Sequence, residues 1–167
     1  MNVPFIHRTA LTMEEFAFQL DRWIELETPE YPILYLGYHG EAGNISLAEG
    51  YDGILNQVTF EAMTSQLAKR CLNRVVHFAS CSTLDLETPV ANNFLVQTAA
   101  SAVSGYTEEV DWIQSLAFDL MYLERMQYGG MYNLTPNVMN GCRDALMHES
   151  PYISLRRHLG FRLHVYK

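Results

Sequence analysis

Hydrophobic and polar positions follow two different periods along this chain, and the two kinds of segment alternate. Short, nearly continuous apolar runs predict strands at residues 3–8, 32–38, 74–81, 101–106 and 160–166. Longer segments, in which apolar residues recur every three or four positions, predict helices at residues 13–27, 59–71, 88–100, 107–127 and 135–150. Residues 44–55 are expected to form a short excursion with turns at Gly50 and Gly53, and residues 150–159 a connector.

Polar residues mark where several of these helices begin. Thr12 precedes the first helix and Glu15 follows three positions later, which is the pattern of a capping box. Thr59 is expected to cap the second helix, and Pro89 suits the first turn of the third. On the helix at 107–127, spacing predicts that one apolar stripe faces the core, formed by Val110, Ile113, Leu116, Ala117, Leu120 and Leu123.

Alternating strands and helices imply a mostly parallel sheet that is covered by helices on both faces. We therefore predict an α/β fold, a three-layer α/β/α sandwich with a mostly parallel central sheet. The length fits one domain, residues 1–167, because no low-complexity tract, linker or repeat marks a boundary.

Composition and charge exclude several classes of function. A net charge of -8 opposes the neutralisation of phosphates, so a nucleic-acid partner is not expected. The first twenty residues lack the pattern of a signal peptide and no apolar run is long enough to cross a bilayer, so we expect a cytoplasmic protein without a membrane partner. Three cysteines without a CxxC pair are expected to be reduced thiols.

Two residues at strand ends are candidates for chemistry. His39 follows the strand at 32–38 and Cys81 ends the strand at 74–81. Loops at the carboxyl ends of parallel strands meet at one edge of a sheet, so an imidazole there can activate a thiol. The backbone N–H groups of Gly40 and Cys81 would then be placed to stabilise an oxyanion. Taken singly, each residue is more often structural, and only the pair favours catalysis.

No cofactor is expected, and no metal site either. His77 shares the strand parity of Cys81, but no third or fourth ligand stands at a useful spacing.

The segments ILYLGYHGEAG (residues 33–43) and VVHFASCST (residues 75–83) resemble the two motifs of caspase-like cysteine peptidases, in which one strand ends in His-Gly and a later strand ends in Ala-Cys or Ser-Cys. The CHAT type, related to caspases and separase, is the most similar variety. AVSGYTEEVDWIQS (residues 102–115) also resembles the segment that helps to shape the P1 pocket in that group. The likeness covers residues 32–115, and the caspase form Gln-Ala-Cys-Arg-Gly is absent.

This resemblance implies a caspase-like fold, His39 as catalytic histidine, Cys81 as nucleophile, and Gly40 with the Cys81 amide as oxyanion donors. It implies a protein or peptide substrate. Because a core of 167 residues has few loops with which to choose a substrate or switch itself on, a partner protein or a second copy is expected for activation. Because Glu108, Glu109 and Asp111 follow the strand at 101–106, a basic P1 residue is expected, although these carboxylates can equally complement a helix N-terminus. The alternative is an inactive caspase-like binding or regulatory module.

Overall fold

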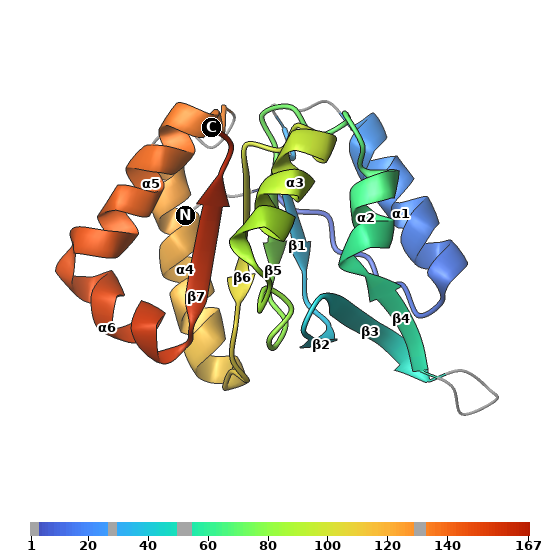
Figure 1. Cartoon of the computed structure of the whole chain (residues 1–167), viewed down its shortest axis with the longest axis horizontal. Coiled ribbons are helices and arrows are strands. Elements are labelled where there is room, and N and C mark those ends of the chain that lie inside the picture. The colour runs from blue at the N-terminus through green and yellow to red at the C-terminus, as the bar shows by residue number, and fades with distance from the viewer. Residues whose placement is uncertain (1–3, 27–29, 50–54, 129–132) are drawn as a thin grey trace.

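The computed structural model describes residues 4–26, 30–49, 55–128 and 133–167. Its elements, shown in Figure 1, are α1 (Met13–Glu25), β1 (Ile33–Leu36), β2 (His39–Glu41), β3 (Asn44–Glu49), β4 (Leu55–Thr59), α2 (Phe60–Gln66), β5 (Val75–Phe78), α3 (Thr88–Thr98), β6 (Ala102–Tyr106), α4 (Trp112–Tyr128), α5 (Pro136–His148), α6 (Ser150–His158) and β7 (Phe161–Val165). In the described residues this is an α/β protein with six helices, a mostly parallel four-stranded sheet and a small antiparallel sheet.

The larger sheet has the strand order β1-β5-β6-β7. β1 pairs in parallel with β5 and β5 with β6, whereas β7 runs antiparallel to β6. Parallel pairing of β1 with β5 brings their carboxyl ends together, with Leu36 opposite Phe78. The chain segments that follow these two strands therefore start from the same edge of the sheet.

Hydrophobic side chains pack on both faces of this sheet, because alternate residues of a strand point to opposite sides. On β5, Val76 and Phe78 join a cluster with α1, α2 and α3, while Val75 joins a second cluster with α4, α5 and α6. Figure 1 shows these two groups of helices on either side of the strands. β1 is less covered than its apolar run predicts: Tyr35 is 43% exposed, because β1 lies at the edge of the sheet.

The helix starts that were predicted from capping residues and proline are confirmed for three helices. Thr12 and Glu15 form the expected capping box at α1, Thr59 caps α2 by accepting a hydrogen bond from Ala62 N, and Pro89 lies in the first turn of α3. α2 ends earlier than predicted, at Gln66. The turn after it includes Lys69 at φ 60°, which is incompatible with a continuing helix.

The predicted opening strand is wrong. Residues 4–8 form no strand, since Phe5 is 83% and Ile6 is 45% exposed and neither gains the burial that would favour pairing. Val3, the first residue of that prediction, lies outside the described residues.

The predicted excursion at residues 44–55 is instead β3 and the start of β4, within the antiparallel sheet β2-β3-β4. Ile45 and Val58 are buried and pair across β3 and β4, which gives these strands a core face. Gly50 and Gly53 lie outside the described residues. The predicted connector at residues 150–159 is also wrong, because this segment forms α6.

α4 differs from its prediction in its start and in its buried face. It begins at Trp112, after a loop at residues 107–111, because Asp111 Oδ1 accepts hydrogen bonds from Ile113 N and Gln114 N, 3.0 Å each. The expected apolar stripe points largely to solvent, with Ile113 79% and Leu116 54% exposed. The core face of α4 is formed instead by Phe118, Asp119, Tyr122 and Met126.

Candidate functional site

Cys81 lies in the turn that follows β5, beside the β2–β3 hairpin that follows β1. Backbone bonding continues past the strands here, since Ala79 N donates to Leu36 O at 2.9 Å. Gly43 N, in the hairpin turn, donates to Thr83 O at 3.2 Å, and Thr83 Oγ1 donates to Asn44 O at 3.1 Å. The hairpin that carries His39 and Gly40 is therefore fixed to the turn that carries Cys81.

Gly40 lies directly against this turn. A Cβ atom added at Gly40 would lie 2.6 Å from the carbonyl oxygen of Cys81 and 2.9 Å from Cβ of Ser80, and it would also collide with Oγ1 of Thr83. The Cys81 oxygen is a backbone atom and Ser80 Cβ is bonded to the backbone, so neither can move far to make room. The hairpin approaches the Cys81 turn this closely because position 40 has no side chain.

We expect Gly40→Ala to lower the free energy of unfolding by about 1–3 kcal/mol, because the new methyl group overpacks the hairpin against the turn. Urea unfolding followed by circular dichroism measures this change. Gly141→Ala is the matched control: an added Cβ there meets nothing within 4 Å, and it replaces a glycine inside α5. The control should gain about 0.5–1 kcal/mol from helix propensity. Equal stability of Gly40→Ala and the parent would contradict the close approach.

The sulfur of Cys81 contacts the backbone of the loop at residues 107–111. Val110 N donates to Cys81 Sγ at 3.5 Å, and Sγ lies 3.9 Å from Val110 O. The turn and the loop are further joined by Ser82 N donating to Glu108 O at 3.0 Å and Leu84 N donating to Tyr106 O at 2.9 Å. An N–H group that points at sulfur stabilises a thiolate more than a thiol.

Cys81 also differs from the other two cysteines in exposure. It is partly exposed, whereas Cys71 and Cys142 are buried. Burial raises the pKa of Cys71 to about 12, and burial likewise raises the pKa of Cys142 to about 12. Both buried groups are therefore protonated thiols near neutral pH, so Cys81 is the candidate for thiol chemistry.

His39 is exposed on β2, and its ring packs against Trp112 with the centroids 6.2 Å apart. Among the described residues, the hydrogen bonds of Cys81 Sγ go to Val110 and none goes to His39. The structure thus brings the two segments together without joining the two side chains. The amide N–H of Cys81 donates no hydrogen bond to another described residue, so it is free to donate one to an oxyanion.

The three acidic candidates occupy different positions. Glu108 and Glu109 are exposed on the loop that contacts the Cys81 turn. Asp111 is exposed too, but its Oδ1 caps α4. This is the alternative given from the sequence, in which the carboxylate complements a helix N-terminus.

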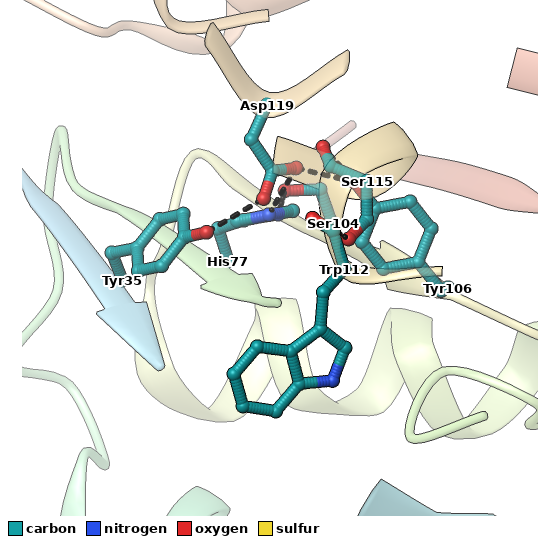
Figure 2. Close-up of polar contacts among 7 residues, drawn as sticks. All are labelled: Tyr35, His77, Ser104, Tyr106, Trp112, Ser115 and Asp119. Atoms are coloured by element: carbon teal, nitrogen blue, oxygen red, sulfur yellow. Dashed lines mark hydrogen bonds and ion pairs between the residues drawn. The ribbon is translucent and has the colours of Figure 1, made fainter. Parts of the chain in front are cut away.

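A second group of polar side chains, most of them buried, lies between β1, β5, β6 and α4, as Figure 2 shows. Asp119 is at its centre and is only 2% exposed. Its Oδ2 accepts a hydrogen bond from Tyr35 Oη at 2.6 Å, and its Oδ1 bonds with His77 Nε2 at 3.0 Å and with the Tyr106 hydroxyl. The other ring nitrogen of His77 bonds with Ser104 Oγ at 3.0 Å.

This network keeps Asp119 ionised despite its burial. Burial alone raises the pKa of the carboxyl, but the charge and hydrogen bond of His77, with the hydroxyls of Tyr106 and Tyr35, outweigh it and hold the pKa below its ordinary value. Burial and the neighbouring Asp119 charge raise the pKa of both Tyr35 and Tyr106, so these phenols stay protonated donors.

Ser104, His77 and Asp119 have the residue types of a hydrolytic triad, but their surroundings do not suit that role. Ser104 is 0% and His77 1% exposed, so no substrate carbonyl can reach the hydroxyl. The ring also presents Nε2 to the carboxylate and Nδ1 to the serine, the reverse of the serine-protease arrangement. We assign these three residues a structural role. His77 thus has partners other than Cys81, and no group of three or more metal-ligating side chains is found in the described part of the chain.

Two surface hollows lie away from Cys81. One of about 520 Å³ lies between α2 and α3, where Phe60, Thr64 and Asn93 are among its lining residues. The other, of about 250 Å³, is lined by residues of α5, α6 and β7 that include Arg143 and Arg156. Neither of these two hollows is lined by His39 or Cys81.

No helix within the described ranges has the length and apolar character that crossing a membrane requires. A search of curated proteins found no match to the chain. A family model does match, and it spans residues 1–165. This chain belongs to DUF6642, a family of unknown function.

Proposed function

We propose that this protein is a caspase-like cysteine endopeptidase, built on a caspase-like three-layer α/β/α fold, with Cys81 as nucleophile and His39 as its acid–base partner. One observation carries the proposal. The hairpin that bears His39 and Gly40 is hydrogen-bonded to the turn that bears a partly exposed thiol, at the carboxyl ends of two adjacent parallel strands.

The proposed reaction proceeds in two stages. Cys81 Sγ loses its proton to His39 and attacks the peptide carbonyl carbon, and the N–H groups of Cys81 and Gly40 stabilise the oxyanion. The C–N bond then breaks as the imidazolium protonates the leaving amine. Water, deprotonated by His39, then attacks the thioester carbon. The C–S bond breaks, the peptide acid is released, and the imidazolium returns its proton to Cys81 Sγ.

This reaction requires His39 to move its ring from Trp112 toward the sulfur. The side chain is exposed on a short strand, so rotation about its own torsions meets few neighbours. Catalytic hydrogen bonds are often long or poorly aligned before substrate binds and tighten only in the complex. The proposed substrate is a protein or peptide, and binding it is the event that draws His39 into place.

The proposed P1 preference is for arginine or lysine. Glu108 and Glu109 present exposed carboxylates on the loop whose backbone contacts Cys81 and Ser82. A cation next to the scissile bond would be attracted by both groups, whereas an aspartate would be repelled. A partner protein or a second copy remains the proposed means of activation.

One observation favours a second candidate, an inactive binding or regulatory module of the same fold. The ring of His39 packs on Trp112, and Cys81 Sγ bonds with Val110, so each side chain already has a partner other than the proposed one. If these contacts persist when peptide is present, the two groups cannot act together.

Covalent labelling separates the two candidates. We expect a peptide chloromethyl ketone with arginine or lysine at P1 to modify the parent at Cys81, and to modify His39→Ala at least about tenfold more slowly, since general-base assistance is typically larger than this. Cys81→Ala should not be labelled. Cys142→Ala, which removes a buried thiol, should be labelled like the parent.

Intact-mass measurement and peptide mapping give the extent and the site of labelling. Equal labelling of the parent and His39→Ala would mean that the imidazole does not assist the thiol, and would favour the module. Faster labelling by an aspartate peptide than by arginine or lysine peptides would exclude the proposed P1 preference.

A further inference from the structure

The buried network around Asp119 is linked by hydrogen bonds to the loop that contacts the Cys81 sulfur. The Tyr106 hydroxyl bonds with Asp119 Oδ1 and also lies 3.2 Å from the carbonyl oxygen of Ser115, in the first turn of α4. Ser115 Oγ in turn donates to Trp112 O at 3.2 Å. Figure 2 shows these contacts running from the buried carboxylate to the exposed Trp112 at the start of α4.

The start of α4 fixes the end of the loop at residues 107–111. Ser115 N donates to Asp111 O at 2.9 Å, so the last residue of the loop is hydrogen-bonded to the first turn of α4. Val110, whose N–H points at Cys81 Sγ, is the residue before it. The other end of the loop is held where Thr107 N donates to Gly160 O at 3.1 Å. The direction of the Val110 N–H group therefore depends on how firmly the first turn of α4 is held.

We propose that Tyr106 is a positioning residue for Cys81: its hydroxyl, on β6, contacts both Asp119 and the Ser115 carbonyl of α4, fixes the start of this helix, and so keeps the Val110 N–H directed at the sulfur. Ser115 extends the same link to Trp112, against which His39 packs. This inference rests on the proposed function only in giving the thiol a chemical role. The effect on thiol reactivity can be measured whether or not the protein cleaves peptides.

Tyr106→Phe is the direct test, because it removes one hydroxyl and leaves the ring. The contacts of this ring with His77 and Phe161, at centroid distances of 6.0 and 5.8 Å, can persist in the variant. The backbone bond from Leu84 N to the carbonyl of residue 106 also persists. Ser115→Ala is the second variant, since it removes only the Oγ contact with Trp112 O at the surface.

The readout is the rate at which iodoacetamide alkylates Cys81, measured over a range of pH on the peptide that contains it. Weakening one hydrogen bond to the thiolate should slow alkylation at pH 7 by about two- to tenfold in Tyr106→Phe. The pH of half-maximal rate should rise accordingly. The titratable side chains His39, Glu108, Glu109 and Asp111 are unchanged in every variant.

Tyr122→Phe is the matched control. It also removes a hydroxyl from a fully buried tyrosine whose ring contacts His77, but that hydroxyl makes no hydrogen bond with Asp119 or with the first turn of α4 in the described part of the chain. Its alkylation profile should match that of the parent. In concentrated urea, all variants should react alike.

Slower alkylation of Cys81 in Tyr106→Phe, together with a parent-like rate in Tyr122→Phe, would support the inference. Parent-like rates in Tyr106→Phe, or equal slowing in the control, would overturn it. Ser115→Ala keeps the carbonyl that the Tyr106 hydroxyl contacts, so its rate should stay close to that of the parent. If Tyr106→Phe does not fold in plain buffer, the comparison with the parent and Tyr122→Phe is repeated in sucrose, which stabilises the folded state. If alkylation changes as expected but no peptide is cleaved, the proposed function fails and the positioning role stands. If peptide is cleaved while alkylation in Tyr106→Phe does not change, the positioning role fails and the proposed function stands.

Discussion

Replacing Cys81 with alanine is expected to lower kcat/KM for a peptide with arginine at P1 by at least about a thousandfold, because the variant has no atom that can form the acyl-enzyme. Release of a fluorescent leaving group measures this rate. The sulfur is the reacting atom in the proposed mechanism, so no neighbouring group can replace it. Cys71 and Cys142 are buried and have a raised pKa, which excludes them as substitutes.

The control for this experiment is Cys142→Ala, which removes a thiol of the same kind from a place without proposed chemistry. It should keep the parent rate within about twofold, since buried free cysteines act as small apolar residues. The double variant His39→Ala/Cys81→Ala should be no slower than Cys81→Ala alone, because residues that act as one unit are not additive. Residual activity of Cys81→Ala close to the parent would eliminate the thiol mechanism.

Asp119→Asn is expected to lower the free energy of unfolding by about 2–3 kcal/mol, because groups buried beside it lose the charged acceptor of their hydrogen bonds. The carboxylate accepts hydrogen bonds from two tyrosine hydroxyls and pairs with His77, and all of these groups lose an ionised partner. An amide has only one oxygen, and its NH₂ group would face other donors. Urea unfolding followed by circular dichroism measures the change.

Asp144→Asn on α5 is the matched control, because it removes one negative charge from an exposed aspartate. Its free energy of unfolding should stay within about 0.5 kcal/mol of the parent. A loss in Asp119→Asn no larger than this would mean that the buried network contributes little to stability.

The effect of Asp119 also has a defined pH dependence. Its pKa is lowered in the folded protein, so the ionised group stabilises the fold above the pKa of the unfolded chain, which is about 4. That contribution is lost as the pH falls through the folded value. The difference in stability between the parent and Asp119→Asn should therefore be full at pH 6–7 and shrink below about pH 4.

Features that depend on neighbours in sequence were predictable. The capping box of Thr12 and Glu15 uses residues three positions apart, and the strand at β5 is a single buried run. The antiparallel sheet was missed because its turn at Gly43 lies within a segment that resembles a loop after a strand. His39 is consequently the first residue of β2 and not a loop residue.

The orientation of α4 shows why apolar spacing alone can fail. A count of apolar residues selects the face with Ile113 and Leu116, and that face is exposed. The buried face contains Asp119, which is acceptable in the core only because Tyr35, Tyr106 and His77 are partners from three strands. His77 and Asp119 are 42 positions apart, so no local pattern shows that they pair.

The sequence allowed us to predict that two strand ends meet at the candidate site, but not which side chains contact Cys81 and His39. Parallel pairing of β1 with β5 places Gly40 next to the Cys81 turn. The contacts of Cys81 with Val110, and of His39 with Trp112, depend on where α4 begins, which apolar spacing misplaced.

The close approach of Gly40 to the Cys81 turn also limits how sequences of this family can diverge. The space beside residue 40 is already occupied by the hydroxyl of Thr83 and the backbone of Cys81. A relative with alanine or serine at this position would need a smaller residue at position 83 and a displaced turn as well. Substitutions at positions 40 and 83 should therefore be inherited together, and an alignment of relatives should show them as a covarying pair.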